Sequence, residues 1–493
     1  MAHSEQPHDG LQNRAEIPSP PCHTFRHCYE RGHKWSHGRK YLAGPFFVTA
    51  SSGRFFARPV FLSCCVLVVC RSSISLHGPT MTQPDPANKA TPAAPAMTGL
   101  AGWIEARLPV ISAFRAEYID FRLPRNLNGL WNFGAILTVV LLLMLATGIF
   151  LAMNYTPTNA GAFLSVEAID RQLAGGWLLR AMHMTGANLF LAALYVHLFR
   201  GLYYGSYKAP RELLWLSGLV LLVMVMATAF AGYMLPWGQM SYWGADVITK
   251  AVGAIPGIGP SLEHIMAGGD HLGDVFLHRF FVLHFLLAFL VVGVVGLHVT
   301  IVHVNGSNNP LGIEPRTPKD TVPFYPYYIS KDLVGLIVFA MVFAALMFFW
   351  PNVLIEADNY TPADPMHTPA DIEPEWYFLP FYGLLQSVPS KFGGLLASAT
   401  SLLILFALPW LDRSPVRSMR FRPLCRIGLF GLVAAFILLA AAGKHHAQGG
   451  WLIVARLAGI YYFGYFLVLL PLVSRKEKTR PLPSSIAAAQ GEH

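Results

Sequence analysis

The sequence predicts an all-α polytopic membrane protein with eight transmembrane helices. Apolar residues make up 54% of its 493 residues and charged residues only 13%, whereas about a quarter of an ordinary soluble domain is charged. Several stretches of about twenty mostly apolar residues are long enough to cross a bilayer as helices. Lys and Arg are also spread unevenly over the connections between these stretches. Together these features exclude a soluble enzyme, a disordered chain and a disulfide scaffold.

The N-terminal region, residues 1–98, differs from the rest of the chain. Residues 1–80 are rich in His, Arg, Ser and Cys, and their one apolar run is too short to span a bilayer as a helix. Residues 82–96 are rich in Pro and Ala, as in flexible linkers. We therefore interpret residues 1–98 as a disordered or mis-assigned leader and linker, with the true start at Met81 or Met97.

An amphipathic segment follows at residues 99–121. Its apolar residues recur at helical spacing, and Arg107 and Arg115 fall among them. This pattern is typical of a helix that lies on the membrane surface. Pro109 is expected to kink or split this helix.

Eight apolar segments are the expected membrane spans. The first four, with the surface helix, form a predicted domain at 99–310, and the last four form a second at 311–475, followed by a cytoplasmic tail at 476–493. The spans are expected at 130–153, 176–203, 212–235, 275–303, 333–350, 393–411, 424–442 and 451–473.

The basic residues predict the orientation. Connections on one side hold only Arg171, Lys250, Lys391 and Lys444, whereas 18 lie on the other side. The positive-inside rule then places both termini in the cytoplasm. The net charge of +9 is thus a topology signal and predicts no nucleic-acid partner. The 18 are Arg107, Arg115, Arg122, Arg125, Lys208, Arg211, Arg316, Lys319, Lys331, Arg413, Arg417, Arg420, Arg422, Arg426, Arg475, Lys476, Lys478 and Arg480.

Two of the expected spans carry a matched pair of histidines. His183 and His197 are 14 residues apart, and so are His284 and His298. Fourteen residues rise about 21 Å and end about 40° short of four full turns, so each pair lies on one stripe of its helix. Ionisable residues inside a membrane are costly and usually functional.

Both of these helices run in the same direction, so His183 faces His284 and His197 faces His298 at matching depths. Zinc would require further Cys, His or carboxylate ligands. Two opposed imidazoles suit a haem iron, whose remaining positions the porphyrin fills. A single membrane histidine is more often a hydrogen-bonded packing residue, but the matched set predicts two stacked haems.

Glycines repeat the same interval on the two neighbouring spans. Gly134 and Gly148 are 14 residues apart, and so are Gly218 and Gly232. Glycine lets a helix backbone approach a flat ring closely, although helix–helix contact is the alternative for each one alone. The four spans are therefore expected to form a four-helix bundle that holds two haems.

Two arginines bracket the histidine pair on the second span. Arg180 and Arg200 each lie three residues outside it. A guanidinium binds carboxylates through a two-pronged contact, so both are candidates for the haem propionates. The alternative is that these side chains extend to the lipid headgroups.

A possible quinone site lies beyond His298. His303 is rotated about 140° from the ligand stripe and lies close in sequence to Ser307, while Asp332 opens the fifth span on the same side. A histidine, a hydroxyl and a carboxylate can together supply the two protons that a quinone takes up on reduction. A solvated helix end remains the alternative.

Glu375 is the candidate proton acceptor of the long connection before the sixth span. It lies in the run Pro-Glu-Trp-Tyr, and Tyr382 follows shortly after. Aromatic and apolar neighbours desolvate a carboxylate and raise its pKa. The segment that begins at Gly232-Tyr233 is expected to cover the same pocket. An ordinary solvated loop acid is the alternative for Glu375.

These residues resemble cytochrome b, the central subunit of the respiratory quinol–cytochrome c oxidoreductase (complex III). The resemblance covers roughly residues 100–475. It is carried by the motifs RAMH, YVHLFRGLYYGSYKAPRE, GYMLPWGQMSYWGADVIT, RFFVLHF, GSNNPLGI, DNYTPADP and PEWYFLPFY.

The resemblance implies a role for each candidate residue. It implies that His183 and His284 ligate a low-potential haem b on the positive side, and His197 and His298 a high-potential haem b. It further implies a quinol-oxidising site with Glu375, Tyr382 and Tyr233, and a quinone-reducing site with His303, Ser307 and Asp332.

The resemblance also implies a bifurcated reaction. One electron of ubiquinol passes to a Rieske iron–sulfur protein and a membrane-anchored c-type cytochrome. The other passes through both haems to ubiquinone, and the coupled proton movements charge the membrane. A homodimeric complex is implied as well. The Pro/Ala-rich head and the basic tail favour a bacterial inner membrane over a mitochondrion.

The chain departs from the family pattern at a few positions. Asn188 replaces a residue that is often small, and His264 and His271 enrich the connection after the third span. Three alternatives stay open: a photosynthetic plastoquinol-type relative, a haem-free transporter, and a dihaem membrane anchor. The plastoquinol relatives usually split these helices between two chains, and one of their His pairs is spaced by 15.

Overall fold

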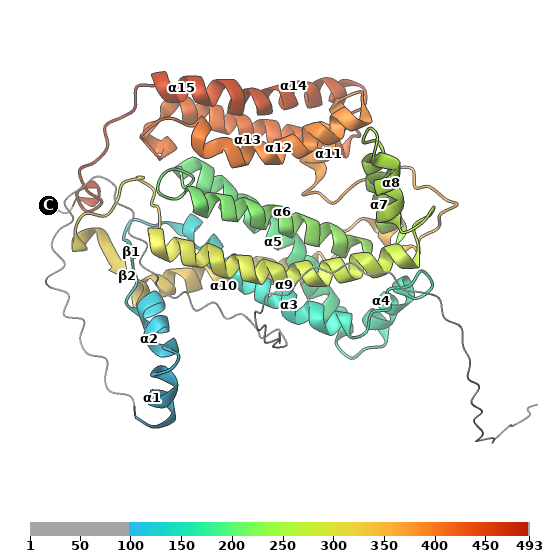
Figure 1. The fold of residues 1–493 in the computed structure, drawn as a ribbon, viewed down its shortest axis with the longest axis horizontal. Helices are drawn as coiled ribbons and strands as arrows, with labels where there is room; N and C mark the ends of the chain where they lie inside the picture. Colours follow the sequence, from blue (N-terminus) through green and yellow to red (C-terminus); the bar gives the residue numbers. More distant parts are fainter. Residues whose placement is uncertain (1–97, 492–493) are drawn as a thin grey trace, which may run out of the picture. The chain divides into compact units, whose positions relative to one another are not determined.

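The computed structural model describes residues 98–491, so the predictions for residues 1–97 lie outside the described part. The described residues confirm the all-α class, and eight of their helical segments are long and apolar enough to cross a membrane. The long helices run side by side (Figure 1). α4, α7, α8 and α11 lie at one end of these helices, and α1, α2 and the two strands lie at the other (Figure 1).

The first four spans pack as two pairs, α3 with α5 and α6 with α9. These four helices are made mostly of apolar residues. A helix in lipid forms its backbone hydrogen bonds within itself and exposes apolar side chains to the lipid. Val140, Leu141, Phe190 and Val291 form one buried cluster between these pairs. The bounds are Phe133–Ala152 for α3, Gly176–Tyr204 for α5, Glu212–Met234 for α6 and Asp274–Asn305 for α9.

The amphipathic N-terminal segment is split at Pro109, as expected. α1 spans Gly99–Glu105 and α2 spans Val110–Phe114. The Glu105 carboxylate accepts hydrogen bonds from the backbone N–H groups of Ile111 and Ser112, at 2.8 and 2.9 Å, and so bridges the break. Neither helix has a buried residue, which leaves its apolar face free for the lipid interface.

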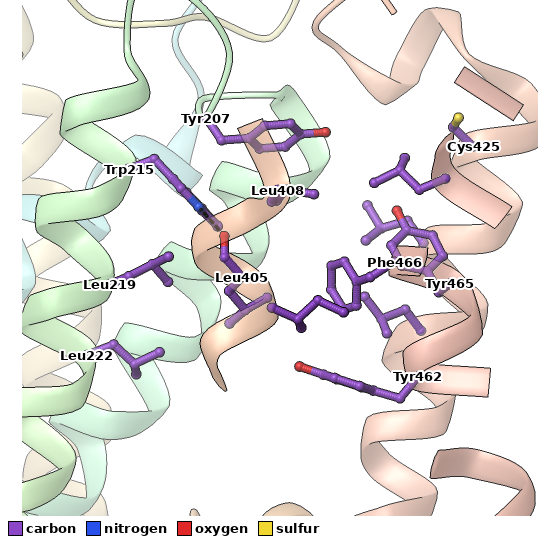
Figure 2. Packing of buried hydrophobic residues seen from close by; sticks show 14 of the residues in the cluster. Tyr207, Trp215, Leu219, Leu222, Leu405, Leu408, Cys425, Tyr462, Tyr465 and Phe466 are labelled. Carbon is purple, nitrogen blue, oxygen red and sulfur yellow. Dashed lines mark hydrogen bonds between the residues drawn. The ribbon is translucent and has the colours of Figure 1, made fainter. Parts of the chain in front are cut away.

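Of the last four spans, α12, α13 and the span made of α14 and α15 pack together as a second group, whereas α10 packs against α3 and α5 of the first group. Trp215 on α6 donates a hydrogen bond from Nε1 to the Leu405 carbonyl of α12, at 2.9 Å. Around this bond a large apolar cluster joins the two halves, with Leu219 and Leu222 of α6 on one side and Phe466 on the other (Figure 2). The helices are α10 (Ile329–Phe349), α12 (Lys391–Leu411), α13 (Pro423–Lys444), α14 (Gly450–Gly464) and α15 (Leu470–Lys476).

Four shorter helices lie in the connections and were not predicted. They lie at one end of the bundle (Figure 1). Apolar residues of α4, α7 and α8, such as Tyr242 and Ala267, join Trp237 and Phe276 in one buried cluster. The helices are α4 (Ala162–Arg171), α7 (Gln239–Gly253), α8 (Gly259–Ala267) and α11 (Leu379–Ser387).

The opposite end is closed by a short antiparallel ribbon and by the C-terminal tail. β1 (Arg122–Pro124) pairs with β2 (Thr321–Pro323). The tail packs against the molecule, because Ile486 is fully buried and the Ala487 N–H donates to the Asp320 carboxylate at 2.8 Å. Burial acts against ionisation of Asp320, but this bond and further backbone N–H donors lower its pKa to about 2.

Three of the 18 residues counted as cytoplasmic charges are buried in ion pairs. Lys208 and Arg422 both contact Asp412, and Arg211 pairs with Glu314. These residues hold connections together, so the topology signal rests on the other fifteen.

Candidate functional site

His183 on α5 and His284 on α9 face each other inside the first bundle. Their ring centroids are 6.2 Å apart and the rings are inclined by 74°. A metal ion placed between two imidazoles forms metal–nitrogen bonds of about 2.0–2.1 Å. Each nitrogen lies about 1.1 Å from the centre of its ring, so the two ring centroids must be about 6.2–6.4 Å apart. The separation therefore fits one metal ion held between the two imidazoles.

Hydrogen bonds determine which ring nitrogen of each histidine in this pair carries the proton and which one is free to bind a metal. The Thr147 hydroxyl donates to the Leu143 carbonyl at 2.8 Å, so it accepts the 2.9 Å bond from His183 Nδ1. His284 Nδ1 donates to the Thr228 carbonyl at 2.7 Å. Both rings are thus assigned a proton on Nδ1, which leaves the Nε2 lone pairs for a metal.

The second histidine pair is less symmetric. The Ser217 hydroxyl donates to the Leu214 carbonyl at 2.9 Å and accepts from His298 Nδ1 at 2.8 Å, which repeats the arrangement at His183. For His197 Nδ1, residues 98–491 provide no such acceptor. Instead Arg200 Nη2 lies 3.3 Å from its Nδ1 and 3.5 Å from its Nε2.

Each predicted glycine lies against the edge of one of the four imidazoles. A Cβ on Gly232 would be 2.5 Å from His284 Cε1, and one on Gly148 would be 3.1 Å from His183 Cε1. The corresponding distances are 3.2 Å from Gly218 to His298 and 3.8 Å from Gly134 to His197. The glycines therefore make room for the histidine rings, in addition to any room that they leave for a haem.

The two bracketing arginines differ in their surroundings. Arg180 lines the cavity beside His183 and forms an ion pair with Asp170 of α4, so a partner from the chain already holds its charge. Arg200 stacks over Trp131, 5.2 Å from the ring centroid, and its buried Nε has no hydrogen-bond partner among the described residues. Trp131 Nε1 is likewise buried and unpaired within that part of the chain. Two unpaired buried donors suit an anionic group such as a propionate.

A single cavity of about 290 Å³ connects the first histidine pair with the predicted proton acceptor. Its lining includes His183, His284, Tyr233 and Glu375, and it is otherwise mostly apolar. Residues that are almost 200 positions apart in the sequence thus line one cavity. Tyr382 is not part of this lining, and its hydroxyl donates to the Ile372 carbonyl at 3.4 Å.

The environment of Glu375 favours a neutral carboxyl group. Burial, and then the charge of Glu356, raise its pKa to about 7. Burial also raises the pKa of the neighbouring Tyr377. The Tyr233 hydroxyl is buried without a partner among the described residues. A carboxyl group that titrates near neutral pH is suited to proton transfer.

The predicted quinone-reducing residues lie at the other end of α9. His303 Nδ1 lies 3.2 Å from the Glu117 carboxylate, and its ring contacts Phe121 at 4.6 Å. Ser307 donates to the Asn308 carbonyl at 2.9 Å. Asp332 has a buried carboxylate oxygen without a partner among residues 98–491. In the described part of the chain, no hydrogen bond, ion pair or ring contact joins His303 to Asp332 directly.

The sequence analysis missed the groups that orient the histidines. Thr147 and Ser217 each directly precede a predicted glycine, Gly148 and Gly218. This repeated hydroxyl–glycine pair was a usable signal. Glu117 was also missed, because it lies in the amphipathic segment that was interpreted only as a membrane anchor.

The geometry defines a class of protein. Opposed imidazoles with free Nε2 atoms, inside a bundle of membrane-spanning helices, are typical of integral membrane proteins that hold a metalloporphyrin. The comparisons with known proteins identify the family within this class.

Two family models match the chain in succession. The one described as cytochrome b/b6/petB matches residues 118–306, and the one described as cytochrome b (C-terminal)/b6/petD matches residues 362–463. Cytochrome b of Rhodospirillum rubrum is 52% identical over 386 residues, which cover 78% of this chain and 95% of the relative. Cytochrome b of Cereibacter sphaeroides is 45% identical over 413 residues, which cover 79% and 93%.

A solved structure described as a hyperthermophilic respiratory complex III agrees with these relatives. It is 34% identical with a TM-score of 0.73, and the match covers 77% of this chain and 99% of that one. The chain belongs to the cytochrome b family, and its role is that of the cytochrome b subunit of complex III. Family membership implies haem binding and removes the transporter alternative.

Proposed function

We propose that this cytochrome b subunit oxidises ubiquinol beside Glu375 and reduces ubiquinone beside His303. The observation that carries the proposal is the shared cavity. It places a carboxyl group of raised pKa and a pair of metal-competent imidazoles around one apolar space. A quinol bound beside Glu375 would lie next to a proton acceptor, and next to the haem that His183 and His284 would hold in the rest of this space.

His183 and His284 are proposed to hold one haem b, and His197 and His298 a second. Bound haem supplies a one-electron carrier on each side of the membrane. Thr147, the Thr228 carbonyl and Ser217 keep three of the rings in the orientation that ligation needs. Arg200 is proposed to pair with a propionate through its unpaired Nε–H, and Arg180 to share its charge between Asp170 and a propionate.

Glu375 is proposed to accept a proton from the quinol hydroxyl as the quinol gives up its electrons. Glu356, which helps to raise the pKa of Glu375, is partly exposed and lies 3.5 Å from Lys444. It offers the proton a route toward solvent. At the other end, His303 with Glu117, Ser307 and Asp332 is proposed to supply the protons that a quinone takes up on reduction.

The proposal includes partners and a location. A Rieske iron–sulfur protein takes the first electron and passes it to a membrane-anchored c-type cytochrome, within a homodimeric complex. The bacterial relatives support an inner membrane, and the distribution of basic residues supports a cytoplasmic position of both termini.

The test is carried out on the purified complex. Dithionite reduction is expected to give b-type absorption bands from two haems per chain. Glu375→Gln should slow ubiquinol oxidation at least tenfold and leave both bands intact. Asp371→Asn, an exposed acid four residues earlier, serves as the matched control and should leave turnover unchanged. Full turnover in Glu375→Gln would contradict the assignment of Glu375.

A further inference from the structure

Helix α5 holds the segment around Glu375 through two hydrogen bonds. Trp376 Nε1 donates to Asn188 Oδ1 at 2.8 Å, and the Tyr195 hydroxyl donates to the Tyr377 carbonyl at 2.6 Å. The Tyr195 and Trp376 rings also meet edge to face, with centroids 6.3 Å apart. The two residues that follow Glu375 are therefore both attached to the helix that carries His183.

Asn188 and Tyr195 lie on a face of α5 different from that of the histidines. They are seven residues apart, which is close to two turns, and Asn188 is rotated about 140° from His183. One face of the helix thus presents the imidazoles, and another holds the connection with Glu375. A single rigid element sets the distance between the two groups.

The orientation of the Asn188 amide is fixed by its second bond. Its Nδ2 donates to the Met184 carbonyl at 3.1 Å, and a carbonyl can only accept. Oδ1 must therefore point toward Trp376, whose indole N–H can only donate. The Asn188 side chain is 5% exposed, so water does not readily replace a lost partner.

We propose that Asn188 and Tyr195 are positioning residues for quinol oxidation, and that they fix Glu375 relative to His183. This inference rests on the proposed role of Glu375. Neither residue is proposed to touch the reacting atoms.

The experiment is a double-mutant cycle on the assembled complex. Asn188→Ala and Trp376→Phe should each raise the KM for ubiquinol about tenfold, because each leaves a buried group unpaired or frees the segment. The double variant should be no worse than either single variant, because both remove the same bond. Both b-type bands and their midpoint potentials should stay unchanged. Tyr195→Phe tests the second bond independently and should raise KM in the same direction.

Two further variants control the cycle. Asn188→Gln keeps both an acceptor oxygen and an amide donor, and its KM should be closer to normal than that of Asn188→Ala. Thr185→Ala, at a buried position three residues earlier on α5, should leave KM unchanged. Multiplicative effects in the double variant, or a normal KM in both Asn188→Ala and Tyr195→Phe, would overturn the proposal. A failure of Glu375→Gln to slow turnover would instead overturn the proposed function, so the two failures are distinguishable.

Discussion

Single hydroxyl groups decide which nitrogen of a histidine is available for a metal. Ser217 donates its only proton to the Leu214 carbonyl, so it can serve His298 Nδ1 only as an acceptor. Thr147 does the same for His183. Such partners typically change metal affinity or activity by about 10–100-fold when they are removed.

Ser217→Ala is therefore expected to weaken haem binding at the site of His197 and His298. The loss should appear as a lower content of one b-type haem, or as a shift in its midpoint potential during a redox titration. Ser401→Ala is the matched control, since Ser401 is also buried and donates to a carbonyl of its own helix at 2.6 Å. Equal haem content and potential in the two variants would show that Ser217 does not orient the ligand.

The raised pKa of Glu375 predicts a pH dependence. Below about pH 7 the carboxyl group is protonated and cannot accept a proton, so kcat/KM for ubiquinol should fall as the pH is lowered. The decline should approach tenfold for each pH unit and level off above the pKa. Glu375→Gln should flatten this profile. A profile that keeps its shape in Glu375→Gln would assign the titration to another group.

At the residue scale, the two histidine pairs can be predicted from the sequence, because their 14-residue spacing can be counted directly along the chain. The acceptors of the hydroxyl protons are backbone carbonyls, which every residue carries, so no side-chain pattern reveals them. The electrostatic effect of Glu356 on Glu375 depends on how a long connection folds back on itself. That path is set by tertiary packing.

At the scale of elements, the close approach of paired helices requires the glycines. A Cβ at Gly232 would come within 2.5 Å of the His284 ring, whereas one at Gly134 would lie 3.8 Å from the His197 ring, an ordinary contact distance. The two glycine pairs have the same spacing in the sequence, but the four positions differ in how much room they leave for a side chain.

Alanine substitution is therefore expected to have graded effects. Gly232→Ala should displace the His284 ring and abolish one b-type haem. Gly148→Ala and Gly218→Ala, at 3.1 and 3.2 Å, should lower haem content partially, and Gly134→Ala should be nearly normal. Haem content from reduced-minus-oxidised spectra measures the series. An equal loss of haem at all four positions would show instead that each glycine makes room for the haem and not for a histidine ring.

Long spans are predictable from sequence and short helices are not. The span expected at 275–303 corresponds to Asp274–Asn305 in α9, because a span must be apolar on average over about twenty residues. α4, α7, α8 and α11 have no such requirement. They are stabilised by contacts with distant residues, such as the hydrogen bond from the Ser241 N–H of α7 to Asn359 Oδ1 at 3.0 Å.

At the scale of the whole molecule, one buried ion-pair cluster joins the two halves. Asp412, at the end of α12, accepts two hydrogen bonds from Arg422 at 2.7 and 2.9 Å. It also accepts one from the Tyr207 hydroxyl at 2.5 Å and pairs with Lys208 at 2.9 Å. Tyr207 and Lys208 directly follow α5, so the cluster connects the helix with the imidazoles to the second half.

The cluster responds to pH in a defined direction. Burial alone would raise the pKa of Asp412, but the hydrogen bonds and charge of Arg422, and then Lys208, lower it below its ordinary value. The carboxylate therefore stabilises the fold above the pKa of an unfolded Asp, about 3.9. That contribution is lost as the pH falls through the folded pKa.

Asp412→Ala should lower the stability of the protein by weakening the attachment between the two halves, because it leaves Arg422 and Lys208 buried without their shared carboxylate. Removing one partner of a buried pair costs about 3–5 kcal/mol, so thermal unfolding of the solubilised protein should begin at clearly lower temperature. Asp120→Ala removes an acid from an exposed pair with Arg115 and should change stability by less than about 1 kcal/mol. Equal melting temperatures for the two variants would mean that the apolar cluster around Trp215 alone joins the halves.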